Sequence, residues 1–404
     1  MRAPFLSRSV LILIISWLAC VVPTLFLDNH FLFPSIKTEI LMISFLSAIV
    51  CGMTIDSFSN IKEADMKPLY LSSFGERVCR GMLIIYFLSV SLVVLRTLYY
   101  SFYYDIHLTR GQIYSPVKGI DSSLFSVIYV SALYLKGLAS PFCYFFSLKE
   151  MNLGKKIVPF IFVGLVLFDA FAFSSKAPLV ELLFFVGVYY FLFTVFSKKN
   201  VFQLGVISLA LLLAVLWIVV ARGGLDAGYS SLMFYFSTGP VFLSSLVDIG
   251  DGLAGSDWSN QGGILVFSGL DYFISLFFRV VGVSIETIGF DWIRHISETG
   301  VVGQGYPGGF ALSTAFYTIL AEPYVSFGFF GVLLFGYLIG NTLSKLERNV
   351  LAVHCDRSLF WFLYFYKIII FGVFGSPFNS VVFWLVLGFV LLAARALFHV
   401  KRRV

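Results

Sequence analysis

Residues 155–173 read KKIVPFIFVGLVLFDAFAF, and this stretch decides the class of fold. Two lysines precede an apolar run from residue 157 to residue 173, which contains a single charged residue, Asp169. A helix of about 17 residues or more can cross the hydrocarbon core of a bilayer, which is roughly 30 Å thick. Such a segment must be helical, because lipid offers no partner to an open backbone hydrogen bond. The stretch therefore predicts a transmembrane helix.

The same pattern recurs along the chain. Hydrophobic residues make up 59% of its 404 residues and charged residues 12%, about half the charged share of an average soluble domain. Apolar segments long enough to approach or cross a membrane lie at residues 10–27, 40–55, 81–100, 124–147, 157–173, 179–196, 201–220, 324–343, 359–375 and 381–398. The predicted fold class is all-α, a polytopic membrane bundle of about ten transmembrane helices.

Basic residues between these segments predict their orientation, because short cytoplasmic loops carry an excess of Lys and Arg. With the N-terminus inside, the inner segments hold Arg2, Arg8, Lys62, Lys67, Arg77, Arg80, Lys149, Lys155, Lys156, Lys198, Lys199, Lys345, Arg348, Arg357, Lys401, Arg402 and Arg403. The short outer loops hold Lys37, Arg110, Lys118 and Lys176. Both termini are therefore predicted to be cytoplasmic. No small-residue cleavage site follows the first apolar run, so we interpret it as a retained helix.

One long segment, residues 221–323, separates the seventh and eighth predicted helices. It lies outside in this topology. The predicted domains are therefore a bundle of seven helices in residues 1–220, the loop at 221–323, and three helices in residues 324–404. Long loops of this kind usually carry binding or catalytic residues. The loop is therefore the expected place of function.

Two parts of this loop, residues 231–247 and 264–283, are apolar enough to enter the membrane, which would raise the number of spans to twelve. If only one crossed, the basic C-terminal tail would lie outside. If both crossed, an acidic connector that contains Asp248, Asp251 and Asp257 would lie inside. Both outcomes oppose the charge rule. We therefore expect re-entrant or interfacial helices that lie against the bundle.

Ionisable residues inside the predicted helices are costly and tend to be functional or paired. They are Arg96, Lys136, Asp169, Glu181 and Lys367. Arg96, Asp169 and Glu181 lie toward the outer ends of their helices, which indicates chemistry that opens outward. Asp169, Lys176 and Glu181 could instead form an ion cluster that tightens one helical hairpin. The two lysines could snorkel or make a satisfied interhelical contact.

The long loop begins and ends with motifs suited to a phosphate or a sugar. At its start, glycines beside Arg222 in Ala221-Arg222-Gly223-Gly224 let the backbone approach a phosphate while the guanidinium binds it through two hydrogen bonds. An interfacial arginine followed by a flexible turn is the plainer alternative. At its end, a Gly-rich stretch at 303–310 leads to EPYVSFGFFG at 322–331. Glu322, at the mouth of an apolar helix, is costly unless it bonds to a polar group.

In these features the chain resembles the Wzy-type O-antigen and oligosaccharide repeat-unit polymerases. The resemblance covers the whole architecture, with one dominant outer loop, Arg-Gly-Gly at its entry and Glu-x-Tyr-x-x-Phe-Gly-x-x-Gly at the start of a helix. Ala321 and Ser326 stand where that family often has Gly and Asn. The resemblance implies a glycosyltransferase of the bacterial inner membrane. Such an enzyme joins oligosaccharides linked to undecaprenyl diphosphate at the periplasmic face.

This chemistry assigns roles to particular residues. An acceptor hydroxyl needs a base within hydrogen-bond reach, and Glu322 and His295 are the candidates. The residues expected to bind the diphosphate are Arg222, Arg279 and Arg96. The aromatic residues that could stack on sugars are Tyr229, Tyr235, Trp292 and Tyr306, although an aromatic belt at the membrane surface also accounts for most of them. No cofactor is implied.

The implied partners are the lipid-linked donor and acceptor, the bilayer and a chain-length regulator protein, with no nucleic acid. Two other functions remain open. A related ligase moves finished polysaccharide onto lipid A core, and a transporter or flippase would be expected to have evenly spaced helices with short loops. Asp248 and Asp251 could be offered as a metal site, but carboxylates in a Gly-rich connector are more often solvated turn residues. We therefore expect no metal.

The topology leads to a first prediction. Reporter fusions after Lys199 and after Arg403 should read cytoplasmic, and a fusion within residues 249–263 should read periplasmic, because basic residues concentrate on one side. Paired alkaline phosphatase and fluorescent-protein fusions measure this. A cytoplasmic reading within 249–263 would require twelve spans.

Overall fold

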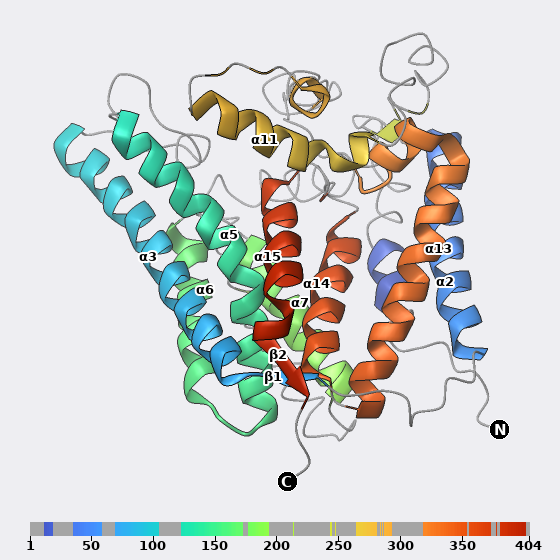
Figure 1. Ribbon diagram of the computed structural model, residues 1–404, viewed down its shortest axis with the longest axis horizontal. Coiled ribbons are helices and arrows are strands. Elements are labelled where there is room, and N and C mark those ends of the chain that lie inside the picture. Colours follow the sequence, from blue (N-terminus) through green and yellow to red (C-terminus); the bar gives the residue numbers. More distant parts are fainter. Residues whose placement is uncertain are drawn as a thin grey trace. The chain divides into compact units, whose positions relative to one another are not determined.

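The computed structural model describes residues 12–18, 35–58, 69–104, 123–172, 177–193, 213, 243–244, 247, 264–280, 283, 285, 287–292, 318–353, 355–372, 377 and 380–400. Its main elements are α2 (Ile36–Phe58), β1 (Leu69–Leu71), α3 (Ser73–Tyr104), α5 (Ser123–Asn152), α6 (Ile157–Ala172), α7 (Ala177–Phe193), the 3-10 helix η3 (Ile264–Phe267), α11 (Ser268–Val280), α13 (Ala321–Val353), α14 (Asp356–Phe371), α15 (Val381–Leu397) and β2 (Phe398–Val400). The described part of the chain is thus almost entirely helical, as predicted (Figure 1).

Four described helices are long and apolar enough to cross a membrane, which supports the prediction of a helical membrane protein. They cover residues 36–54 of α2, 73–104 of α3, 124–152 of α5 and 321–351 of α13. α6, α7 and α15 are apolar but shorter. The predicted seventh helix, at 201–220, lies almost entirely outside the described residues, so the total of about ten spans stays a prediction.

The chain divides into two compact units. Unit 1 contains residues 1–66, 226–352 and 365–387, and unit 2 contains residues 67–225, 353–364 and 388–404. α14 and α15 therefore each contribute to both units. The predicted division at residues 220 and 323 follows topology rather than packing, and it stays a prediction.

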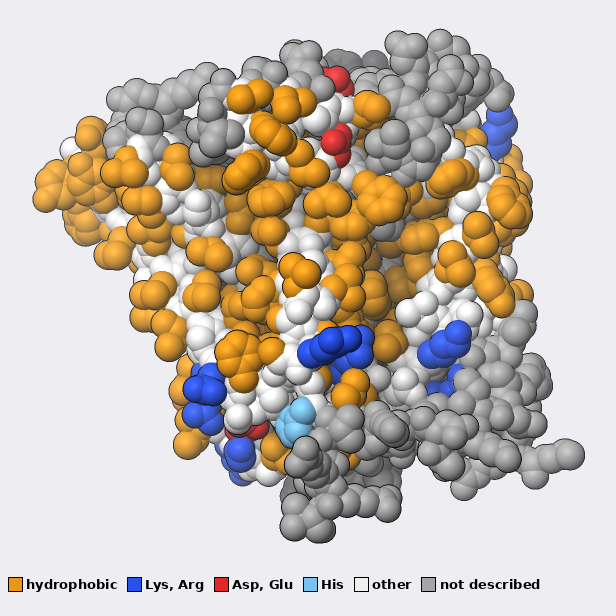
Figure 2. Space-filling model, viewed as in Figure 1, with side chains coloured by type: hydrophobic (Ala, Val, Ile, Leu, Met, Phe, Trp, Pro, Cys, Tyr) orange, Lys and Arg blue, Asp and Glu red, His pale blue; other side chains and the backbone are white. Residues whose placement is uncertain are grey.

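In unit 2, α3, α5, α6 and α7 pack side by side through aromatic rings. The ring of Tyr144 stacks on Phe185 with centroids 4.1 Å apart and meets the edge of Phe162 at 4.7 Å. The ring of Tyr86, on α3, also contacts the ring of Phe162, on α6. The outward side chains are also apolar, as Phe160 is 81% and Leu95 63% exposed, and hydrophobic side chains cover the middle of α3 and α5 on the face in Figure 2. A surface this apolar fits a hydrocarbon environment rather than water.

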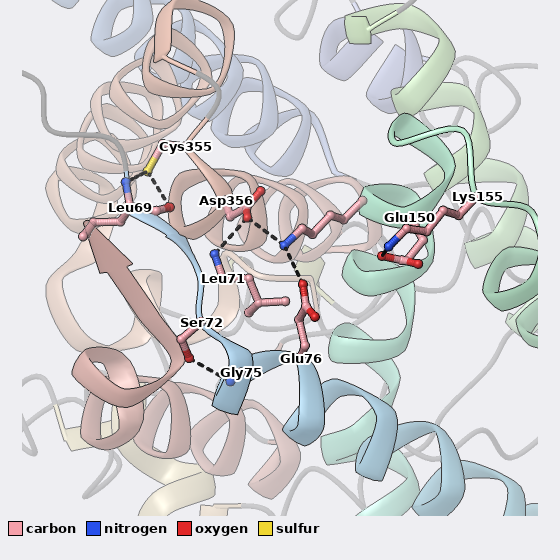
Figure 3. Close-up of polar contacts among 10 residues, drawn as sticks. Leu69, Leu71, Ser72, Gly75, Glu76, Glu150, Lys155, Cys355 and Asp356 are labelled. Carbon is pink, nitrogen blue, oxygen red and sulfur yellow. Dashed lines mark hydrogen bonds and ion pairs between the residues drawn. The ribbon is translucent and has the colours of Figure 1, made fainter. Parts of the chain in front are cut away.

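A two-stranded antiparallel sheet, which the sequence did not predict, ties one end of unit 2 together. β1 precedes α3 and β2 follows α15, and Tyr70 pairs with His399. Between β1 and α3, the hydroxyl of Ser72 accepts a hydrogen bond from the Gly75 amide at 2.8 Å and donates one to the Ala396 carbonyl at 2.5 Å. Ser72 therefore caps α3, through the bond to Gly75 drawn in Figure 3, and also joins α3 to the end of α15.

An ion cluster lies at the same end of unit 2 (Figure 3). Lys149, in the last turn of α5, lies 3.0 Å from Asp356 and 3.7 Å from Glu76, which begin α14 and α3 respectively. Asp356 also accepts a hydrogen bond from the Leu71 amide at 2.9 Å. The starts of α3 and α14 and the ends of α5 and α15 therefore share one end of the unit. The predicted alternation of helix directions requires this arrangement.

In unit 1, α2 and α13 pack so closely that glycine is required at the contact. A Cβ atom on Gly340 would overlap the Ile49 carbonyl oxygen, and one on Gly336 would lie 2.9 Å from the Phe45 carbonyl oxygen. The residue numbers rise together on both helices, so α2 and α13 run parallel, as their predicted orientations require. Small residues allow close backbone approach between membrane helices.

α11 runs crosswise to α13 rather than alongside it (Figure 1). It has 13 residues, about 20 Å of helix at 1.5 Å per residue, which is too short to cross a bilayer. It is strongly amphipathic, with Phe273, Ile274 and Phe277 exposed. The re-entrant or interfacial position expected for residues 264–283 stays a prediction.

The α2–α13 contact leads to a second prediction. Gly340→Ala should lower the free energy of unfolding by about 1–3 kcal/mol, because the added methyl group meets rigid backbone. Gly164→Ala is the matched control, since nothing lies within 4 Å of a Cβ there, and alanine favours a helix interior by about 1 kcal/mol over glycine. Thermal unfolding in detergent measures both. A melting temperature of the Gly340→Ala variant equal to that of the wild-type protein would contradict the close contact between α2 and α13.

Candidate functional site

The candidate site lies at the start of α13, which bends sharply at Gly328. This residue has φ 63° and ψ −156°, a backbone conformation that favours glycine. The bend separates a short segment, 321–327, from the rest of the helix. This short segment is the beginning of the stretch 321–351 that is long and apolar enough to cross a membrane.

Gly331 has a different reason to be glycine. A Cβ atom there would lie 2.6 Å from the carbonyl oxygen of Pro323, in the short segment. The backbone of the segment can therefore fold closely against the helix that follows. The two glycines of the EPYVSFGFFG motif thus have separate structural roles, one in the bend and one in the close approach.

Glu322 lies on the bent segment and is fully buried, with 0% of its surface exposed. The indole Nε1 of Trp292 donates a hydrogen bond to its Oε1 at 3.5 Å. Trp292 is also 0% exposed. Burying a carboxyl group is expensive unless polar groups compensate. The indole N–H is one such group, and it fixes the orientation of the carboxyl.

α11 positions the segment that carries Trp292. Asp271 accepts a hydrogen bond from the Gly289 amide at 2.5 Å, and Ser275 donates one to the Ile285 carbonyl at 2.8 Å. Tyr272 also stacks on Phe290, with ring centroids 5.6 Å apart. Asp271 is not among the predicted site residues. What marks it in the sequence is that it is the one carboxylate in an otherwise mostly apolar helix.

Residues 318–320, just before the bent segment, are also buried. Thr318, Ile319 and Leu320 are each 0% exposed. The Ile319 amide donates a hydrogen bond of 2.7 Å to the carbonyl oxygen of Gly372, directly after α14. This bond fixes the segment that precedes Glu322 to the end of α14. The carboxyl group therefore follows directly on an anchored piece of backbone.

The structure thus brings together two predicted site residues, Glu322 and Trp292. Trp292 was expected to stack on sugar, whereas its buried indole contacts the carboxyl, so its glycan role stays a prediction. For Arg279 the structure gives only the backbone position, in the last turns of α11. The remaining predicted residues of unit 1, His295, Tyr229, Tyr235 and Tyr306, lie outside the described residues, as does Arg222 of unit 2.

Arg96 lies in unit 2 and is only 3% exposed. Its guanidinium carbon is 4.3 Å from the ring centroid of Tyr129 and 5.2 Å from that of Tyr100. Each cation–π contact of this kind contributes about 0.5–2 kcal/mol. The rings of Tyr100 on α3 and Tyr129 on α5 thus offset part of the cost of burying Arg96, and its predicted diphosphate role remains a hypothesis.

Asp169 has a partner that the sequence did not identify. Its Oδ1 lies 2.6 Å from the Nζ of Lys136, and its Oδ2 accepts a hydrogen bond of 2.5 Å from the hydroxyl of Tyr86. The three residues come from α6, α5 and α3. The alternative that Lys136 makes a satisfied interhelical contact is confirmed. The alternative cluster with Lys176 cannot be compared, because Lys176 lies outside the described residues.

Metal-type clusters are absent from the described part of the chain, which holds no group of three or more His, Cys, Asp or Glu residues. Asp248 and Asp251 lie outside it. No model of a known protein family matches this chain, and no curated protein or solved structure matches it either.

The buried ion pair leads to a third prediction. Lys136→Met and Asp169→Asn should each destabilise the protein by about 3–5 kcal/mol, because each leaves an uncompensated polar group in the bundle. The double variant should lose less stability than the sum of the losses in the two single variants. Thermal unfolding in detergent measures all three.

Lys156→Met is the matched control. Lys156 is exposed, and a surface substitution of this kind changes stability by at most about 0.5 kcal/mol. Strict additivity of the two buried substitutions would contradict the pairing of Lys136 with Asp169.

Proposed function

We propose that this chain polymerises polyprenyl-diphosphate-linked oligosaccharide repeat units, as in O-antigen synthesis, at the outer face of the bacterial inner membrane. The observation that carries the proposal is the buried carboxyl group of Glu322, held by the Trp292 indole on a segment that Gly328 bends away from a membrane helix. Placing an ionisable group at the end of an apolar helix costs free energy, and residues of this kind tend to be functional.

The proposed reaction uses this carboxylate as a general base. The acceptor hydroxyl loses its proton to Glu322 while its oxygen forms a bond to the anomeric carbon of the growing chain. The bond between that carbon and the lipid diphosphate breaks, and the diphosphate leaves with the electron pair. Positioned bases of this kind contribute about 10²–10⁴-fold to rate. His295 is the alternative base.

The leaving diphosphate carries charge that has to be stabilised, and arginine suits this task because its planar guanidinium binds phosphate oxygens in pairs. The proposal assigns this role to Arg222 and Arg279, with Arg96 as a third candidate. Arg279 lies in the last turn of α11. The same helix holds the Trp292 segment through Asp271. The framework that orients the base would thus also carry an arginine.

Glu322→Gln provides the test, and a fourth prediction. The amide keeps the shape of the side chain and loses the base, so polymer length should collapse toward single repeat units while the protein remains in the membrane. The measurement is the length distribution of surface polysaccharide on a gel, in a deletion strain complemented with each variant. Glu347→Gln is the matched control, since Glu347 is also buried, at 6% exposure, at the other end of α13.

Three outcomes would change the proposal. Normal chains from Glu322→Gln together with short chains from His295→Ala would make His295 the base. Normal chains from both variants would contradict the proposed site. A deletion strain with no attached glycan at all, rather than single units, would identify the ligase reaction in place of polymerisation.

A further inference from the structure

An apolar cavity of about 240 Å³ lies between α13 and α14 in unit 1. Its walls are Ile319, Phe335, Leu338, Ile339, Thr342, Leu343, Phe365, Ile368, Ile369 and Phe383. Thr342 is the one side chain of this lining with a polar atom. An ordered water needs two to four polar partners, so this cavity does not suit water. Its chemistry suits a hydrocarbon.

The two sides of the cavity differ in exposure. Ile319, Leu343 and Ile369 are at most 1% exposed and form its inner wall. Leu338 is 51% exposed and lies in the part of α13 that is apolar enough to cross a membrane. The cavity is therefore reached from the side of the helix that faces hydrocarbon. A chain could enter it sideways, without passing through water.

The inner wall also leads to the candidate site. Ile319 lines the cavity and lies three residues before Glu322, on the buried segment that is fixed to Gly372 by a hydrogen bond of 2.7 Å. A molecule whose polar head reacts at Glu322 would therefore have its apolar part beside this wall. The cavity and the carboxyl group share one piece of backbone.

We propose that this cavity binds the hydrocarbon chain of the lipid-linked glycan donor, an inference that rests on the proposed function. A cavity of about 150 Å³ holds a benzene-sized molecule, so about 240 Å³ accommodates a segment of an isoprenoid chain, on the order of two units. The rings of Phe335, Phe365 and Phe383 offer flat walls to its methyl groups and double bonds. Seating the chain there fixes the depth of the diphosphate relative to Glu322.

Photo-cross-linking to the full-length protein tests this fifth prediction. The probe is a polyprenyl phosphate with a diazirine in the chain, in vesicles of phosphatidylethanolamine and phosphatidylglycerol. We expect labelling of peptides that contain residues 335–343 and 365–369, and its displacement by unlabelled polyprenyl diphosphate. Leu338→Trp should reduce this labelling at least fivefold, because the indole fills the mouth of the cavity.

Leu334→Trp is the matched control. Leu334 lies one turn away on the same helix, is 47% exposed, and does not line the cavity, so labelling should be unchanged. An unaffected Leu338→Trp variant would overturn the proposal. So would a diazirine phospholipid that labels the same peptides and is not displaced by polyprenyl diphosphate, because bulk lipid would then occupy the cavity.

The binding readout is independent of catalysis. Glu322→Gln should lose polymer and keep the cross-link, because the cavity does not contain the carboxyl group. Polymer that persists in Glu322→Gln counts against the base assignment, whereas a lost cross-link in the wild-type protein counts against the cavity. The two failures are therefore read separately.

Discussion

The absence of water from the hydrocarbon core is the constraint on which the rest of this protein depends. Backbone hydrogen bonds have to be made within each segment, so the described membrane segments are helices. Polar side chains have to find partners among neighbouring helices. The hydrophobic effect does not drive helices together in lipid, because lipid is as apolar as their side chains. Polar and glycine-mediated contacts therefore add specificity to the packing of the helices.

Three such contacts do this work. Lys136 and Asp169 join α5 to α6, and Tyr86 adds α3 through the second carboxylate oxygen. In unit 1, Gly336 and Gly340 let the backbones of α2 and α13 meet. Each contact is specific in a way that a leucine on a lipid-facing surface is not, because it requires one partner in one register.

The candidate site follows from the same constraint. A carboxyl group cannot lie in the middle of an apolar helix without cost, but Glu322 lies in the first turn of α13, before the bend at Gly328. The Trp292 indole then offsets part of the cost of burial. The apolar cavity beside Ile319 places a hydrocarbon-binding surface directly next to a polar one. This juxtaposition suits an amphipathic lipid-linked substrate.

The sequence by itself determined the positions of most described helices, since these depend only on the length of each apolar segment. It also identified Glu322 as a candidate, because the free-energy cost of a carboxyl group in an apolar stretch can be recognised from the neighbouring residues alone. The tertiary structure alone decided which partners meet. The pairing of Tyr70 with His399 and of Lys136 with Asp169 depends on which helices become neighbours. The sequences of uniformly apolar helices do not predict which helices become neighbours, because the surfaces of these helices are chemically alike.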